Sequence, residues 1–212
     1  MAHISAVCVL HALLPDPPDT LTAIDKRAVP GRVAVGPLGL AGDRQVDTVH
    51  HGGEDQAVYL YADEDADWWA AELGRDIPPG LFGENLRTSG IDLSGTRIGQ
   101  QMRVGGSGLL LEVTAPRVPC MTFSHRMDEP HWVKRFTQRR APGAYARVVH
   151  IGEVSAGDAV DVLEVPAHDV TVADLLPPVA PGAFGRLLDA ERAGAVELSP
   201  RVRRKAMQAA SG

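Results

Sequence analysis

A cysteine close to an arginine is the part of this sequence whose residue types most clearly suggest chemistry. Cys120 ends the segment 114–120, in which Pro116 and Pro119 fix their own φ angles and favour extended geometry in the preceding residues. Arg117 stands three residues earlier, and a guanidinium near a thiol favours the thiolate. The pattern indicates a nucleophile or a metal ligand on a stiff backbone. The alternative is a small buried core residue, which is what most free cysteines are.

Two histidines followed by two glycines form a second candidate at residues 50–53. Adjacent side chains on extended backbone point to opposite sides, so His50 and His51 cannot both serve one metal without a kink. Gly52 and Gly53 allow close approach of a ligand and can offer N–H groups to a phosphate. A tight turn with one exposed histidine is the alternative.

A third candidate is the run Phe82-Gly83-Glu84-Asn85, where a carboxylate and an amide stand beside a glycine in an irregular loop. Paired donors and acceptors of this kind suit the edge of a polar heterocycle. The alternative is a turn in which Asn85 bonds to its own backbone.

Other catalytic patterns receive less support from the sequence. It contains no G-x-S-x-G nucleophile elbow and no Walker phosphate loop. Cys120 could pair with His125 or His131 in cysteine–histidine catalysis, but nothing in the sequence identifies a third group that would orient the histidine.

Composition limits the classes of function. The chain has 212 residues, 44% of them hydrophobic, and a formal net charge of −6, which argues against duplex nucleic acid as the main partner. Two cysteines are too few for a disulfide scaffold, so a reducing, cytoplasmic setting is expected. Neither a signal peptide nor an apolar run of membrane-spanning length is expected.

Short strands separated by turn residues dominate the first part of the chain and predict a closed or nearly closed β structure. One helix is expected at residues 63–73, with acidic residues in its first turn and Gly74 as its stop. The expected strands are 4–10, 32–35 and 57–61, a hairpin of 98–104 with 109–114, and a pair formed by 146–151 and 159–163.

The character of the sequence changes after Pro166, where helix signals take over. Thr171 and Asp174 resemble a capping box, and Ser199 with Pro200 is a typical helix start. The sequence therefore predicts a β domain over residues 1–165 and an appendage of three short helices over residues 166–212.

Four motifs in a fixed order resemble the MOSC domain, the C-terminal domain type of molybdenum cofactor sulfurases. They are Leu-Ala-Gly-Asp at 40–43, His-His-Gly-Gly-Glu-Asp-Gln-Ala-Val at 50–58, Phe-Gly-Glu-Asn-Leu at 82–86 and Pro-Arg-Val-Pro-Cys at 116–120. The resemblance is closest to the stand-alone, YiiM-like branch of the family. It implies a mainly β fold, a MOSC-type β-barrel with peripheral helices and a small C-terminal helical region.

The resemblance also implies a pyranopterin molybdenum cofactor with Cys120 as the thiolate on molybdenum, and at family level a link to pyridoxal phosphate binding. Arg117 is expected to keep the thiol ionised, and His51 or His50 is a candidate proton donor. The residues expected to bind the cofactor are Lys26, Arg44, His50, Gly52, Gly53, Phe82, Gly83, Glu84, Asn85 and Arg117.

The function expected from this resemblance is reduction of small N-hydroxylated compounds, such as hydroxylaminopurines, at the Cys120-ligated molybdenum. A separate reductase must supply the electrons, and the protein is expected to be a monomer or a homodimer. A non-catalytic carrier of the cofactor or of sulfur on Cys120 is the alternative. A structural β domain with Cys120 buried is a third.

Overall fold

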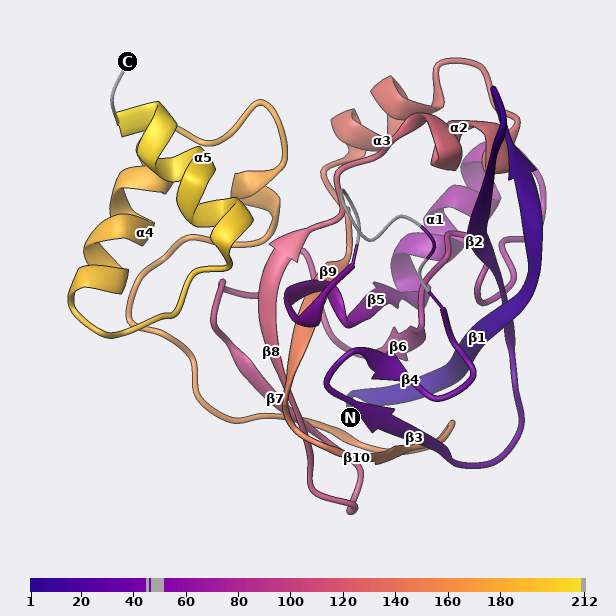
Figure 1. Ribbon diagram of the computed structural model, residues 1–212, viewed down its shortest axis with the longest axis horizontal. Helices are drawn as coiled ribbons and strands as arrows, with labels where there is room; N and C mark the ends of the chain where they lie inside the picture. Colours follow the sequence, from indigo (N-terminus) through magenta and orange to yellow (C-terminus); the bar gives the residue numbers. More distant parts are fainter. Residues whose placement is uncertain (45, 47–51, 211–212) are drawn as a thin grey trace.

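Eight strands form the main sheet of the computed structural model, which describes residues 1–44, 46 and 52–210 (Figure 1). Their order is β11-β7-β8-β9-β5-β6-β1-β2. Neighbours are antiparallel except β5 and β6, which are parallel. The strands are β1 (His3–Asp16), β2 (Thr20–Ala28), β5 (Val58–Ala62), β6 (Leu86–Ser89), β7 (Gln101–Val104), β8 (Leu109–Pro116), β9 (Ala144–His150) and β11 (Val160–Val162).

A smaller sheet has the order β10-β3-β4, with β3 (Val33–Gly36), β4 (Gly39–Leu40) and β10 (Gly152–Val154). Its strand β10 lies, along the chain, between two segments that the sequence predicts to pair. The predicted pairing of 146–151 with 159–163 is wrong, because β9 pairs with β8 and β5 whereas β11 pairs with β7. The intervening β10 pairs with β3 instead. The predicted hairpin of β7 and β8 is confirmed, with Val104 opposite Leu109 across the glycine turn.

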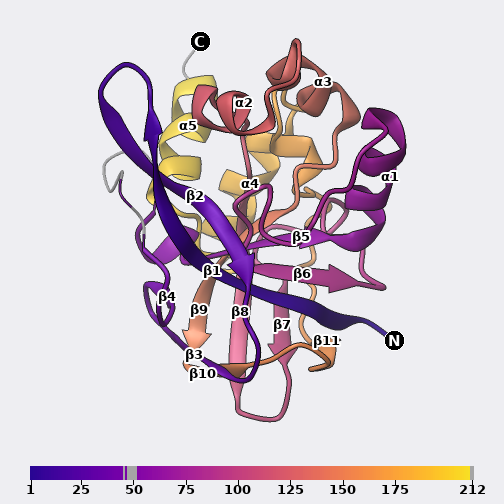
Figure 2. The ribbon, with the colours of Figure 1, turned by 90° about the vertical axis from the view of Figure 1, so that its right-hand side faces the viewer.

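The main sheet is strongly curved, since β5 and β6 run across the direction of β7, β8 and β9 (Figure 2). An isolated bridge between His3 and Ala159 joins the start of β1 to the segment before β11. The strands of the described residues nevertheless form an open series rather than a closed ring. The mainly β prediction is confirmed, and the closed barrel is not.

Helix α1 (Asp63–Leu73) follows the prediction from the sequence residue for residue. Its first turn carries three acidic residues, and Gly74 ends it in the left-handed region with φ 64°. The helix leads from β5 toward the parallel strand β6, and parallel neighbours require such a crossover.

Two helices within the β-rich part were not expected from the sequence, α2 (Met121–Met127) and α3 (Trp132–Arg139). Asp128 caps the end of α2, and His131 and Arg140 cap the start and the end of α3. All three have positive φ although none is glycine. Both helices are short. The buried face of α2 consists of Phe123 and Met127, and that of α3 consists of Trp132 and Phe136. Tertiary packing therefore decides their formation.

The C-terminal region consists of the 3-10 turn η2 (Ala173–Leu175), α4 (Ala183–Arg192) and α5 (Pro200–Ala210). The predicted capping box is present, since Thr171 N donates to Asp174 Oδ2 at 2.9 Å and Asp174 N donates to Thr171 Oγ1 at 3.2 Å. It starts a 3-10 turn rather than an α-helix. Ser199 caps α5, and its Oγ accepts from Val202 N at 3.3 Å.

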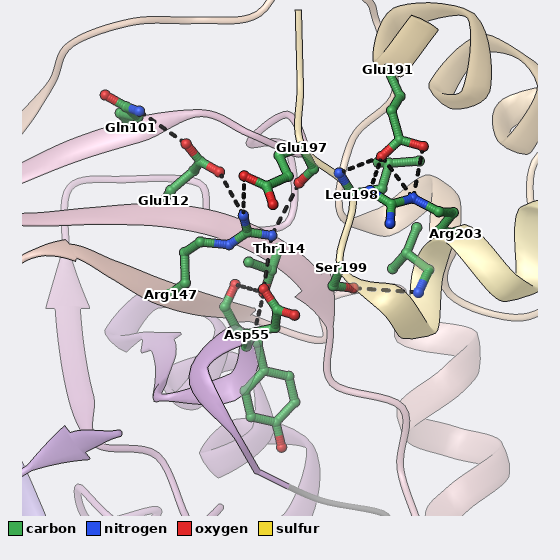
Figure 3. A network of polar contacts seen from close by, with 12 residues as sticks. Asp55, Gln101, Glu112, Thr114, Arg147, Glu191, Glu197, Leu198, Ser199 and Arg203 are labelled. Atoms are coloured by element: carbon green, nitrogen blue, oxygen red, sulfur yellow. Dashed lines mark hydrogen bonds and ion pairs between the residues drawn. The ribbon is translucent and has the colours of Figure 1, made fainter. Parts of the chain in front are cut away.

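Polar contacts join this region to the sheet (Figure 3). Arg147 of β9 reaches Asp55 at 2.8 Å and donates to the backbone oxygen of Glu197 at 3.0 Å. Glu191 of α4 in turn contacts Arg203 of α5 at 2.6 Å. The division into two domains at residue 165 stays a prediction. Apolar side chains of the C-terminal helices pack in the same buried cluster as those of the sheet.

Buried apolar side chains fall into two clusters. The first, here called the aliphatic core, lies along the sheet and includes Leu60, Leu111 and Val113 together with Leu187 and Val202 of the C-terminal helices. The second, here called the aromatic cluster, lies where α1, α2 and α3 gather near one end of the β1–β2 hairpin (Figure 1). It contains Tyr59, Tyr61, Trp69, Phe82, Phe123, Trp132 and Phe136.

Candidate functional site

A cavity of about 600 Å³ opens next to Cys120, which has the volume of an ordinary ligand pocket. Its walls come from the β1–β2 hairpin, the segment after β4, the loop before β6 and the start of α2. Predicted site residues that line it are Lys26, Arg44, Gly83, Arg117 and Cys120. The structure thus brings together residues that are widely separated in the sequence.

Cys120 is the last residue before α2 and has an extended backbone, with φ −126° and ψ 177°. It forms no disulfide, and the residue is partly buried against the aromatic cluster while it lines the cavity. The alternative in which Cys120 is a buried core residue is therefore wrong. That description fits the other cysteine: Cys8 is fully buried, and burial raises the pKa of its thiol to about 12, with Glu84 adding to the effect.

Arg117 is held rigidly beside Cys120. Its Nη1 donates to the backbone oxygen of Phe82, and its guanidinium lies 4.2 Å from the Phe123 ring centroid and 5.0 Å from that of Tyr59. Burial lowers the pKa of Arg117, but its electrostatic interactions with Tyr145, Tyr59, Cys120 and Glu84 outweigh burial and raise it. The wall of the cavity therefore carries a permanent cation next to the thiol.

Gly83 is required where the chain passes between Arg117 and β2. Its φ is +77°, and an added Cβ would lie 2.9 Å from Ile24 Cγ1 and 3.6 Å from Arg117 Nη1. A side chain at this position would be strained and would press on Ile24 of β2.

Lys26 reaches the cavity as one half of a buried ion pair. Its Nζ lies 2.5 Å from Asp43 Oδ2, and the Lys26 side chain is 9% exposed. Burial lowers the pKa of Lys26, although Asp43 opposes the effect. Arg44 also lines the cavity and is exposed, so it adds a solvated cation at the rim.

Glu84 is positioned for a structural role. Its Oε1 accepts from Gly80 N at 2.7 Å and from Arg87 Nε at 2.8 Å, and Oε2 accepts from Phe82 N at 3.0 Å. The carboxylate is fully buried and does not line the cavity.

Asn85 is also occupied within the protein. Its Oδ1 accepts from Tyr59 N at 3.1 Å, and its Nδ2 donates to Asp43 Oδ2 at 2.7 Å. The expectation that Glu84 and Asn85 face the pterin edge does not agree with these contacts. They hold the loop that carries Gly83, and Asn85 also braces the carboxylate that pairs with Lys26.

The remaining predicted residues lie away from the cavity lining or outside the described residues. Phe82 is fully buried in the aromatic cluster, and only its backbone oxygen takes part, through Arg117. Gly52 N donates to Gln56 Oε1 at 3.0 Å, and Gly53 precedes the 3-10 turn η1 (Glu54–Gln56). His50 and His51 fall outside the residues that the structure describes.

The residues that line the cavity and were not predicted from the sequence include Asp16, Thr122 and Tyr145. Asp16 ends β1 and contacts α2, where its Oδ2 accepts from Thr122 Oγ1 at 2.5 Å and its Oδ1 lies 3.0 Å from His125 Nδ1. Asp16 is therefore a group that can orient His125, and the sequence did not reveal it. The helical spacing of Thr122 and His125 was a usable signal, but α2 itself was not expected.

Within the described residues, no group of three or more histidine, cysteine, aspartate or glutamate side chains could hold a metal ion. Over the same residues, no helix is both long and apolar enough to cross a membrane.

Comparison with known proteins identifies the family. Residues 47–161, more than half of the chain, match the model of the MOSC domain. Protein YiiM of Escherichia coli is 34% identical over 155 residues, which cover 71% of this chain and 67% of that protein. A protein named reductase from Gibberella moniliformis is 32% identical over 68% of this chain, but the match covers only 26% of its length. Uncharacterized protein YflK of Bacillus subtilis is 32% identical over 67% of this chain and 63% of its own.

Solved structures agree with this assignment. The crystal structure of YiiM from Geobacillus stearothermophilus superposes with a TM-score of 0.77 at 23% identity, covering 98% of both chains. That of YiiM from Escherichia coli gives a TM-score of 0.72 at 25% identity and covers 98% of this chain and 92% of that one. MOSC domains as a family are associated with the molybdenum cofactor. The chain belongs to the MOSC domain family and is similar to YiiM within it.

Proposed function

We propose that this protein binds a pyranopterin molybdenum cofactor in the Cys120 cavity and reduces small N-hydroxylated compounds there. The observation that carries the proposal is the partly buried Cys120, which is in no disulfide, on the wall of a 600 Å³ cavity whose lining also holds Lys26, Arg44 and Arg117. The family's association with the cofactor and the relative named reductase support it.

The donor set fits the cofactor. A thiolate is a good ligand for a soft metal centre that already carries sulfur ligands. Lys26, Arg44 and Arg117 supply the positive charge that a phosphorylated ligand needs. When bound, the cofactor would supply two-electron redox chemistry and a centre able to accept oxygen.

The chain's own residues prepare the site for that chemistry. Arg117 keeps a fixed positive charge next to Cys120, which favours the thiolate. The guanidinium lies over the ring faces of Phe123 and Tyr59, and it is buried from water. Because this arrangement is buried and rigid before any ligand enters, the thiolate need not be organised at the moment of binding.

The electrons for reduction must come from a separate reductase. This chain has only two cysteines, fewer than an iron–sulfur cluster requires, and Cys8 is sealed in the core. The partly open cavity leaves Cys120 near the surface, as electron delivery by another protein requires.

The proposal is tested by metal analysis of protein made in cells that synthesise the cofactor, followed by an N-hydroxyadenine reduction assay with a chemical electron donor. We expect the wild type to contain molybdenum and to reduce the substrate, and Cys120→Ala to lose both. Cys8→Ala is the matched control, since it removes the other thiol from a site outside the cavity, and it should keep molybdenum per folded protein. Bound molybdenum without reduction would leave the carrier function in place of the reductase.

A further inference from the structure

Three polar residues form a connected group at the mouth of the cavity. Asp16 stands at the end of β1, and Thr122 and His125 lie on α2. Both oxygens of the Asp16 carboxylate are used, Oδ2 by Thr122 Oγ1 at 2.5 Å and Oδ1 by His125 Nδ1 at 3.0 Å. The group therefore links two elements that are far apart in the sequence.

The group reaches from solvent to the cavity. The His125 side chain is 42% exposed, whereas that of Asp16 is 15% exposed. Asp16 and Thr122 line the same cavity as Cys120, and His125 is not in that lining but contacts Asp16. A proton taken up by His125 from water is thus one hydrogen bond away from a carboxylate in the cavity wall.

Neighbouring charges leave Asp16 as the acidic partner of His125. The next residue on the helix, Arg126, pairs with Asp25 of β2 at 2.6 Å, and Asp25 also contacts Arg27 at 3.4 Å. That second carboxylate is therefore already neutralised by two arginines.

The Asp16 carboxylate is also suited to accept a proton only briefly. Partial burial raises its pKa, but the hydrogen bonds from His125 and Thr122 and the charge of His125 outweigh burial and lower it. At neutral pH the carboxylate is therefore ionised and lies within hydrogen-bond distance of the imidazole Nδ1.

We propose that His125 and Asp16 form the proton entry of the site, with Thr122 holding Asp16 in place. The inference rests on the proposed function, because it supplies what that reaction consumes. Reduction of R–NH–OH takes two electrons and two protons and yields R–NH₂ and water. The N–O bond breaks, the departing oxygen becomes water, and the two electrons come from the separate reductase.

The path of each proton follows the contacts. The Nε2 of neutral His125 takes a proton from solvent, and the resulting imidazolium donates its Nδ1 proton to Asp16 Oδ1; exchange of the remaining ring proton with solvent restores the Nδ1–H tautomer. Asp16 passes the proton into the cavity that it lines, and Thr122 Oγ1 keeps its second oxygen oriented meanwhile. This assigns to described residues the proton-donor role that the sequence suggested for His50 or His51.

The test uses His125→Gln, which can keep a hydrogen bond to Asp16 but cannot carry a proton, and Asp16→Asn, which keeps the shape of the carboxylate. His150→Gln is the matched control, because His150 is an exposed histidine at the last position of β9, whereas the cavity residue Tyr145 lies near the first. We expect His125→Gln to lower kcat by about a hundredfold at neutral pH with KM unchanged, the lower end of the range for loss of an acid–base group. Added imidazole should restore part of the rate.

A second readout needs no cofactor. In ¹³C NMR titrations of the purified protein, the carboxyl carbon of Asp16 should titrate at higher pH in His125→Gln than in the wild type, and His150→Gln should leave it unchanged. Urea unfolding of each variant shows whether it is folded.

The outcomes separate the two proposals. If the wild type reduces the substrate and His125→Gln matches it at every pH, or if His150→Gln is equally impaired, the proton entry is wrong while the reductase stands. If the wild type contains molybdenum and reduces no N-hydroxylated compound, the proposed function and the proton entry fall together.

Discussion

The aliphatic core and the aromatic cluster fill the interior in different ways. The aliphatic core follows the sheet and extends into α4 and α5, so it joins most of the chain into one packed body. The aromatic cluster holds all three tyrosines, counting the partly buried Tyr145, three of the four phenylalanines and two of the three tryptophans. Those rings are gathered against Cys120, under the cavity.

The difference shows how stability and function are divided. Aliphatic side chains pack without preferred faces, whereas aromatic rings have faces that attract cations. Arg117 uses two of those faces, and Cys120 packs against the same cluster. We infer that the aliphatic core holds the fold together and that the aromatic cluster additionally holds the charge of the site.

The strongest test of this division is a truncation in each cluster. Phe82→Ala should lower the free energy of unfolding by about 3–5 kcal/mol, and Leu111→Ala by about 2–5 kcal/mol. Only Phe82→Ala should also lower molybdenum per folded protein, because the Phe82 ring packs at 5.3 Å against Phe123, over whose face Arg117 lies. Urea unfolding and metal analysis measure the two effects. Equal loss of molybdenum in both variants would contradict the division.

Removing one half of the buried ion pair should have the next largest effect. Lys26→Met leaves Asp43 buried without its cation, and such losses cost about 3–5 kcal/mol. The double variant with Asp43→Asn should recover part of that cost, because the uncompensated charge is gone. If urea unfolding shows the double variant to be less stable than the single one, the pair is not what limits stability here.

Arginines that stack on the aromatic cluster should differ according to burial. Arg117→Met should cost about 2 kcal/mol and slow alkylation of Cys120 by iodoacetamide about tenfold, because a desolvated cation is lost beside the thiol. Arg135, which stacks on Trp69 at 5.9 Å and is partly exposed, is the control. Arg135→Met should cost about 0.5 kcal/mol and leave alkylation unchanged. Similar alkylation rates in the two variants would show that Arg117 does not act on the thiol.

The smallest effect is expected where the C-terminal region leaves the sheet. His168 Nε2 lies 2.9 Å from Ile98 O, and Nδ1 accepts from Val170 N at 3.2 Å, so the ring is bound as the neutral form. Burial lowers the pKa of His168, although the bond to Ile98 opposes it. A depressed histidine pKa stabilises the protein above the unfolded value near 6.5 and loses that contribution as pH falls through the folded pKa. His168→Gln should therefore flatten the fall in Tm between pH 7 and pH 5 by a few degrees at most, about the worth of one neutral hydrogen bond.

The sequence predicted well those features that depend on local residue patterns. Helix α1, the β7–β8 hairpin and the caps at Thr171 and Ser199 all follow from neighbouring residues. It failed where packing decides. Helix α2 has basic residues in its last turn but a short apolar face, so its signal emerges only once Phe123 meets the aromatic cluster.

The site shows the same limit. Cys120 and Arg117 stand close together in the sequence, so their pairing could be predicted. Asp16 could not be found, because it reaches the site only through the pairing of β1 with β2 and the contact of that hairpin with α2. Glu84 was placed in the site because its residue type suits a ligand, whereas its carboxylate accepts from the loop residues Gly80 and Phe82 and from Arg87 of β6.

X-ray absorption at the molybdenum edge tests the central claim most directly, by comparing the wild type with Cys120→Ser. We predict that the metal shell of Cys120→Ser contains one sulfur fewer than that of the wild type, or that the variant holds no molybdenum. A molybdenum–sulfur shell identical in the two proteins would show that Cys120 is not the ligand and would contradict the account.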